Sequence, residues 1–145
     1  MTSARCLLVA ALGLAACDAS EPTFLVPPGD GLAVRLDRAA YAPEASVRLT
    51  LANETDRAVE LAMPLVLGCS VELERELDDV WARVPLDPTP MCAAAPVRLA
   101  GGATLVETVW LHARAPGTYR YEITIEPGRQ TAVSPPFAVR SPIGA

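Results

Sequence analysis

Apolar and polar residues alternate one by one along most of the chain from Leu32 onward. The clearest stretch runs from Tyr119 to Glu126, where every apolar residue is followed by a polar one. Successive side chains of a β-strand point to opposite faces, so this period predicts strands with one buried and one solvated face. The same pattern, or an apolar run of strand length, recurs in the segments 32–37, 47–52, 59–63, 71–76, 80–84, 103–112, 119–126, 131–133 and 137–140.

Turn-forming residues separate these segments, at Pro43, Asn53–Asp56, Gly101-Gly102 and Pro116-Gly117. The chain holds 14 prolines and 9 glycines, which suits short elements joined by tight turns. Several short strands at this spacing, with no helical period after the leader, predict an all-β fold. We expect a single antiparallel β-sandwich over residues 31–145, preceded by an N-terminal signal helix.

The first 16 residues have the pattern of an export signal. Arg5 precedes an apolar run from Leu7 to Ala16. Ten helical residues span about 15 Å, half of a hydrocarbon core of about 30 Å, so the run is too short to cross a membrane. A basic residue, a short apolar run and small residues before the cleavage point are typical of a secretory signal peptide.

The residues Leu14-Ala15-Ala16-Cys17 resemble the lipobox of bacterial lipoproteins. The resemblance implies that Cys17 carries a thioether-linked diacylglycerol and, as the first mature residue, a further acyl chain such as palmitate. Two or three chains hold a protein stably on a membrane. Residues 17–30 would then be a lipidated tether on the inner or outer membrane, with the domain facing the periplasm or the exterior. The alternatives are a free Cys17 after ordinary cleavage, and a short first strand at 24–26.

The four cysteines divide by position along the chain. Cys6 lies in the leader and Cys17 in the lipobox, which leaves Cys69 and Cys92 for the folded domain. Two cysteines in an oxidising compartment most often pair, and closing this loop would stabilise the fold by about 3 kcal/mol. We therefore expect a Cys69–Cys92 disulfide. A zinc site is the rival, but no second cysteine pair or nearby histidine supplies its other ligands.

The formal net charge is −5, and all 12 basic residues are arginines. An acidic chain is repelled by phosphate and gains nothing from counterion release, which argues against nucleic acid as a partner. The same sign argues against docking on anionic lipid through a basic patch. We expect the chain to reach its membrane through the lipid on Cys17.

Pro116-Gly117-Thr118-Tyr119 lies between two long predicted strands. Sandwich domains often place a tyrosine there, with its hydroxyl bonded back to the corner backbone. The chain over residues 32–140 resembles bacterial immunoglobulin-like domains, in particular the type named for an intracellular proteinase inhibitor of bacilli. The resemblance is carried by Tyr41-x-Pro43, Val47–Asn53, Trp81, Gly101-Gly102 and Pro116–Arg120.

These features lead to one expected function and two alternatives. An anchor, a short tether and one sandwich without a reactive cluster indicate non-catalytic binding or a structural role at the cell envelope. The first alternative, a proteinase inhibitor, follows from the resemblance alone. Its reactive segment would be the loop Pro85–Met91, stiffened by prolines and by the nearby Cys92. The second alternative is a metal-binding periplasmic protein.

Glu72, Glu74, Glu76, Asp78 and Asp79 form the densest acidic run. Calcium needs six to eight converging oxygens, which a straight strand does not supply. We expect these residues to form a solvated outer face that also discourages edge pairing.

His112 is the single histidine, and no Gly-x-Ser-x-Gly motif offers it a nucleophile. With Met63, Met91 or Cys92 it would bind copper only if the fold brought these residues together. We expect a histidine at a strand end instead.

The two tryptophans, Trp81 and Trp110, are expected to pack in the core or on a sheet. Asn53-Glu54-Thr55 matches a glycosylation sequon, but we expect a turn. The sequence thus predicts no catalytic residue, no cofactor and no enzymatic activity. Its partner would be a protein whose identity the residues do not specify.

Overall fold

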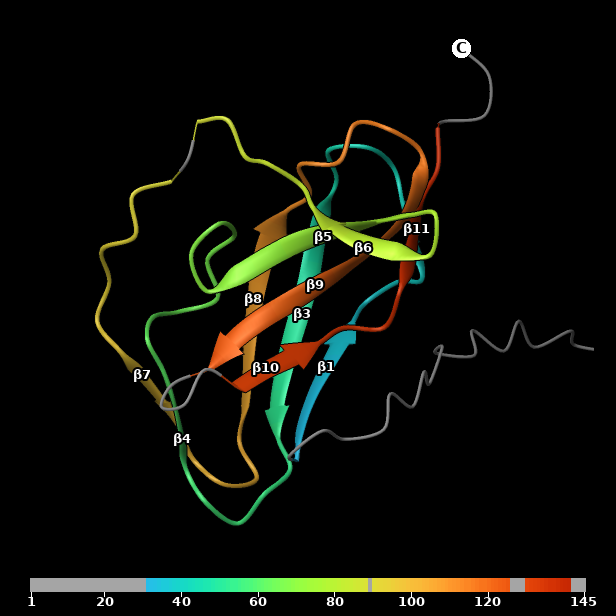
Figure 1. Ribbon diagram of the computed structural model, residues 1–145. Helices are drawn as coiled ribbons and strands as arrows, with labels where there is room; N and C mark the ends of the chain where they lie inside the picture. Colours follow the sequence, from blue (N-terminus) through green and yellow to red (C-terminus); the bar gives the residue numbers. More distant parts are fainter. Residues whose placement is uncertain (1–30, 89, 126–129, 142–145) are drawn as a thin grey trace, which may run out of the picture.

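The computed structural model describes residues 31–88, 90–125 and 130–141, which form two sheets packed face to face (Figure 1). The smaller sheet has the order β1 (Leu32–Leu36), β3 (Ser46–Asn53), β8 (Thr104–Trp110). The larger has the order β2 (Ala40–Tyr41), β11 (Phe137–Val139), β9 (Gly117–Ile125), β5 (Val71–Leu77), β6 (Val80–Arg83), and β10 (Gln130–Val133) also pairs with β9. A separate ribbon joins β4 (Val59–Leu61) to β7 (Val97–Leu99).

The prediction of an all-β immunoglobulin-like sandwich is confirmed by the strand order. β1, β3 and β8 take the places of strands A, B and E, while β5, β9 and the β10–β11 pair take those of C, F and G. β7, in the place of strand D, pairs with β4 and not with β8. As a result β8 is an edge strand of its sheet (Figure 1).

The described part of the chain contains no helix, and therefore none that is long and apolar enough to cross a membrane. The signal helix over 1–16, the lipidated Cys17, the tether over 17–30 and the optional strand at 24–26 lie outside the described residues.

The predicted alternation places apolar side chains between the sheets. Val47 and Leu49 of β3 are fully buried, as is Tyr121 of β9. The ring of Phe137 lies between two tyrosines, with centroids 5.3 Å from those of Tyr41 and Tyr121. Each fully buried aliphatic or aromatic side chain contributes roughly 1.5–3 kcal/mol, so this layer supplies most of the driving force for folding.

The predicted corner tyrosine is also confirmed. The Tyr119 hydroxyl donates to the carbonyl oxygen of Ala115 at 2.8 Å. This bond fixes the connection between β8 and β9 at the point where the chain passes from one sheet to the other.

Asn53, which ends β3, ties two connections together. Its side chain is buried, and Nδ2 donates to the carbonyl oxygens of Arg57 at 2.6 Å and Ala100 at 3.1 Å. Its Oδ1 accepts from the backbone N–H and the hydroxyl of Thr55, at 3.1 and 2.7 Å. The sequon-like triplet is therefore part of a turn, and its Asn53 is a buried structural residue.

Some boundaries differ from the prediction. The segment predicted at 59–63 ends at Leu61, and the one at 103–112 shortens to Thr104–Trp110. β2 and β7 are absent from the prediction, because strands of two and three residues are too short to show a period.

Candidate functional site

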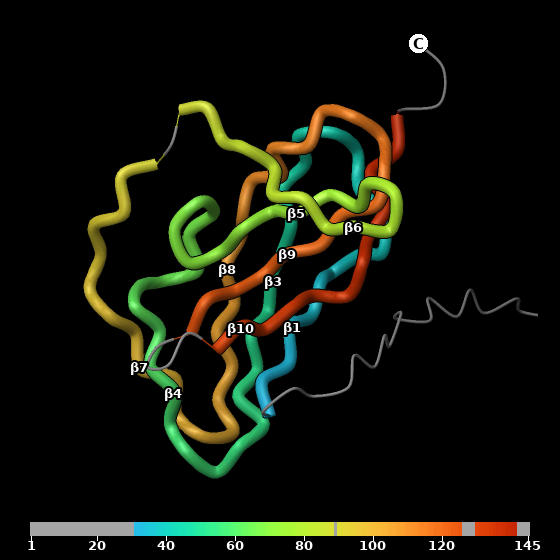
Figure 2. Tube along the Cα trace, viewed as in Figure 1, coloured from blue at the N-terminus to red at the C-terminus, as the bar shows by residue number. Residues whose placement is uncertain are grey.

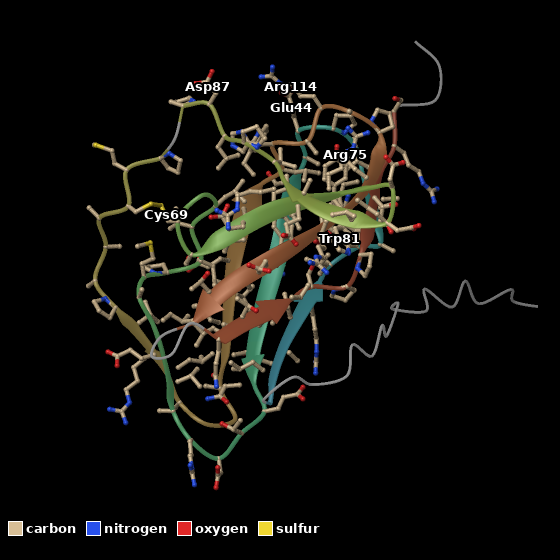
Figure 3. The ribbon with its side chains drawn as sticks, viewed as in Figure 1. Glu44, Cys69, Arg75, Trp81, Asp87 and Arg114 are labelled. Atoms are coloured by element: carbon tan, nitrogen blue, oxygen red, sulfur yellow. A yellow bond between two sulfur atoms is a disulfide. The ribbon has the colours of Figure 1, made fainter. Side chains whose placement is uncertain are left out.

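A disulfide joins two connections at one side of the sandwich (Figure 3). Cys69 lies in the turn between β4 and β5. Cys92 lies between β6 and β7, where the described residues 84–88 and 90–96, called segment 84–96 below, form no strand. Their Cα atoms are 5.6 Å apart across the S–S bond, which confirms the predicted pairing. Cys92 is exposed and Cys69 is partly buried.

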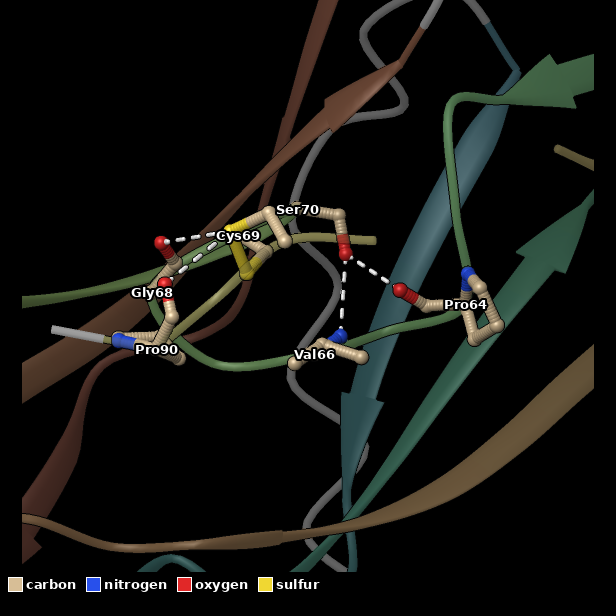
Figure 4. The surroundings of a disulfide bond; sticks show 7 residues. Pro64, Val66, Gly68, Cys69, Ser70 and Pro90 are labelled. Carbon is tan, nitrogen blue, oxygen red and sulfur yellow. Dashed lines mark hydrogen bonds between the residues drawn. A yellow bond between two sulfur atoms is a disulfide. The ribbon is translucent and has the colours of Figure 1, made fainter. Parts of the chain in front are cut away.

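The turn that carries Cys69 is rigidly built (Figure 4). The buried Ser70 hydroxyl donates to the Pro64 carbonyl oxygen at 2.6 Å and accepts from the Val66 N–H at 3.0 Å. The Val66 carbonyl oxygen in turn accepts from the N–H groups of Cys69, Ser70 and Val71, each at 3.1 Å. The disulfide therefore attaches segment 84–96 to a preformed base.

Leu86 and Pro90 of that segment pack directly against Gly68. Its φ is +79°, and a Cβ built there would lie 2.6 Å from Leu86 Cδ1 and 2.7 Å from Pro90 Cγ. Only glycine combines this backbone conformation with such a close approach. Leu86, Pro90 and Cys92 are thus three attachment points of one loop.

Met91 stands between two of these points and is 96% exposed. The residues after it, through Pro96, are exposed as well. In Figure 2 residues 84–88 and 90–96 arch away from the two sheets. The predicted reactive loop Pro85–Met91 is therefore outside the core, with an apolar side chain presented to solvent between fixed neighbours.

The glutamates of the acidic run alternate with the buried Val71 and Leu73, so they lie on the outer face of β5 as expected, but not at a sheet edge. Glu72 pairs with Arg83 at 3.3 Å, and Glu74 pairs with Arg120 at 2.6 Å. The strand that carries them, β5, lies between β9 and β6. The expectation that they guard a sheet edge is therefore wrong: they form cross-strand ion pairs on an interior strand.

Asp78 and Asp79 have a separate role in the tight turn between β5 and β6. Both have positive φ, 50° and 63°, as a two-residue hairpin turn requires. Within the described ranges, no group of three or more His, Cys, Asp or Glu residues could hold a metal ion.

The two tryptophans have unequal environments. Trp81 is partly buried, and the Arg120 guanidinium lies 4.3 Å from its ring centroid, so its expected packing on a sheet is confirmed. Trp110 is 54% exposed at the end of β8, so the expectation that it packs in the core or on a sheet is wrong for most of its surface. β8 reaches the rim of its sheet and leaves the indole uncovered.

One of the residues considered as a copper ligand, Cys92, is not free to bind metal. Cys92 is bonded to Cys69 and offers no thiolate. His112 is exposed just after β8, in agreement with the expected strand-end histidine, while Met91 lies on the 84–96 segment.

Two buried tyrosines have perturbed acidity. Burial raises the pKa of Tyr121 above its ordinary value, and its hydroxyl has no hydrogen-bond partner among the described residues. Burial also raises the pKa of Tyr41, and its hydroxyl donates to Asp37 at 2.8 Å. Both side chains pack around Phe137, so the two phenols are core groups without access to a substrate.

The open edge of β8 is the second accessible feature. The Ala103 carbonyl accepts from Asn53, and the Leu111 N–H donates to Ala45, so odd-numbered residues of this stretch bond to β3. The backbone groups of the even-numbered residues therefore point away from β3, because strand groups alternate in direction. We call these residues the open edge: Thr104, Val106, Thr108 and Trp110.

No protein-family model matches the chain, and no curated protein is found to be similar to it. The class that the described residues define is an immunoglobulin-like sandwich with a disulfide-fixed loop and a long open edge at β8.

Proposed function

We propose that the protein is an exported lipoprotein, held to a membrane by lipid on Cys17, whose sandwich serves non-catalytic binding or a structural role at the cell envelope. The Cys69–Cys92 disulfide carries this proposal. Disulfides persist in oxidising compartments and are rare in the cytosol. The disulfide thus agrees with the short apolar leader and the lipobox-like Leu14–Cys17, which independently indicate export.

The binding role is supported by how the polar groups of the sandwich are used. Glu72 and Glu74 of β5 pair with Arg83 of β6 and Arg120 of β9. The polar side chains of Asn53 and Ser70 bond to backbone. Two surfaces accessible for contact are a fixed loop with an exposed methionine and an open sheet edge. Both are means of binding a protein.

Fractionation of cells that express the full chain tests the anchor. We expect the wild type in the membrane fraction with acyl mass on its N-terminal peptide, and Cys17→Ser in the soluble fraction. Cys6→Ser is the matched control and should remain with the membrane. A Cys17→Ser protein that still needs detergent for extraction would overturn the anchor.

A second candidate, a proteinase inhibitor, is favoured by the fixing of Met91 between Pro90 and the disulfide-bonded Cys92. A loop held in its bound shape loses little entropy on binding, which is how a short segment gains affinity. We propose Met91 as the residue that would enter a protease pocket.

The test is inhibition of a panel of serine and cysteine proteases at micromolar concentration. Met91→Asp should abolish inhibition, because it places a charge in an apolar pocket, and Met91→Leu should retain it. Absence of inhibition across the panel would dispose of this candidate and leave the lipoprotein proposal intact.

A further inference from the structure

β8 is the longest edge strand in the two sheets that the described residues form. It has seven residues, whereas the other edges, β1, β2, β6 and β10, have two to five. A long edge presents a row of unpaired N–H and C=O groups that can template another strand.

The shorter edges are also protected in ways that proteins commonly use. β10 is followed by Pro135 and Pro136, and β6 ends at Arg83. β1 carries Arg35, which pairs with Glu54 at 2.9 Å. β2 is followed by a proline after one residue.

The open edge of β8 has no such protection on its outer face. Its side chains are two threonines, Val106 and Trp110, none of them charged, and Val106 and Trp110 are 41% and 54% exposed. β-Branched and aromatic side chains form the most favourable cross-strand pairs. The edge is thus suited to strand addition in its backbone groups and its outward side chains. The inward Glu107 is the one charge on β8, and such a charge disfavours any added strand that does not compensate it.

We propose that β8 is the docking strand for an extended segment of a different polypeptide, which adds to the smaller sheet as a fourth strand and carries a basic residue opposite Glu107. The inference rests on the proposed binding role and names the surface and the partner chemistry. Glu107 lies on the inner side of β8, is partly exposed, and has no ion-pair partner among the described residues. Opposite charges across a strand pair are favourable and like charges are not.

This charge argues against a second copy as the occupant. In a two-fold antiparallel pairing, the one register that uses all four open-edge residues sets Thr104 against Trp110 and Val106 against Thr108. Glu107 then faces its own counterpart at the axis. Two chains of net charge −5 also repel each other. A basic segment of another protein avoids both the contact between two Glu107 side chains and the repulsion between two acidic chains.

The probe is the capped peptide Thr-Val-Thr-Arg-Thr-Val-Thr, titrated into the isotope-labelled full chain in detergent and followed by backbone amide NMR. In antiparallel register its arginine faces Glu107, and its valines face the inner side with Leu105 and Val109. We expect saturable shifts and slowed hydrogen exchange at the amides of residues 104, 106, 108 and 110. The matched peptide with glutamate in place of arginine should bind about tenfold more weakly.

The Val106→Pro variant tests whether the peptide binds through the outward backbone groups of β8. The Val106 N–H points away from β3, so proline removes one outward donor without breaking the ladder, a position where edge strands tolerate proline. We expect Val106→Pro to abolish the slowed exchange, with β3 amide shifts unchanged to show that the fold persists, while Val106→Thr keeps it.

Four results would overturn the inference: no saturable shifts, shifts centred outside residues 104–110, equal affinity for the two peptides, or a stable dimer through β8 by sedimentation. None of them bears on membrane fractionation of Cys17→Ser, so failure of the docking strand and failure of the anchor are separately visible.

Discussion

Arg75 and Tyr119 hold adjacent carbonyl oxygens of one turn. Arg75 Nη2 donates to Pro116 O at 2.9 Å, while the Tyr119 hydroxyl donates to Ala115 O at 2.8 Å. The guanidinium also lies 5.8 Å from the Tyr119 ring centroid, and the two residues are cross-strand partners on β5 and β9. One pair of neighbouring side chains therefore fixes the connection between the two sheets.

Tyr119→Phe tests this corner. The substitution removes one hydrogen bond and leaves the ring in place, so the free energy of unfolding should fall by about 1 kcal/mol. Urea denaturation of the variant and the wild type measures the difference. An unchanged midpoint would show that the Ala115 bond contributes nothing to stability.

Tyr121→Phe should not lower the free energy of unfolding, although Tyr121 lies only two residues from Tyr119 on the same face of β9. The Tyr121 hydroxyl is buried with no partner among the described residues, so its removal deletes an uncompensated polar group. We expect stability to stay equal or to rise by up to about 1 kcal/mol. A loss as large as that of Tyr119→Phe would mean that the hydroxyl does have a bonding partner.

The same burial predicts an alkaline limit to stability. A phenol whose pKa is raised in the fold keeps its proton at a pH where the unfolded chain has lost it. The free energy of unfolding is therefore full below about pH 10, the ordinary tyrosine value, and falls as the pH rises above it. Melting temperatures measured between about pH 9 and pH 12 should show this decline. The decline should be shallower in Tyr121→Phe, and parallel curves would refute the assignment.

A comparison of Gly68→Ala with Gly102→Ala separates two costs in stability. One is the strain of an alanine at positive φ, and the other is the overlap of its Cβ with segment 84–96. Both glycines have positive φ, +79° and +72°, so each alanine variant should lose about 1 kcal/mol. A Cβ at Gly102 meets nothing within 4 Å, whereas one at Gly68 overlaps Leu86 and Pro90. Gly68→Ala should therefore lose roughly 1–3 kcal/mol more, as overpacked sites do. Equal losses in calorimetry would show that segment 84–96 does not rest on Gly68.

The sequence predicts those parts of the fold that depend on local period or on composition. Alternation around Val47 and Tyr121 reveals the buried faces, and Pro116–Tyr119 reveals the corner, because each signal lies within a few neighbouring residues. The pairing of Cys69 with Cys92 follows from counting, since no other cysteine remains for the domain.

Features that depend on contacts between residues far apart in the sequence are not predictable from a local pattern. Asn53 bonds to Ala100, and Arg75 bonds to Pro116, across separations that no local pattern encodes. The open edge of β8 exists because β7 pairs with β4, and β7 is too short to be predicted. Trp110 is expected in the core or on a sheet and is found 54% exposed. The glutamates of β5 have a pattern that fits either an edge or a centre, and only the strand order decides between them.

The disulfide closes a covalent ring that contains the whole β5–β6 hairpin and most of the exposed loop, including the Met91–Cys92 peptide bond. A protease that cuts any single bond between Cys69 and Cys92 would add one water molecule to the mass and release no fragment. The nicked protein would stay one molecule until its sulfurs are reduced, with both flanking halves of the sandwich still joined through the base of the loop.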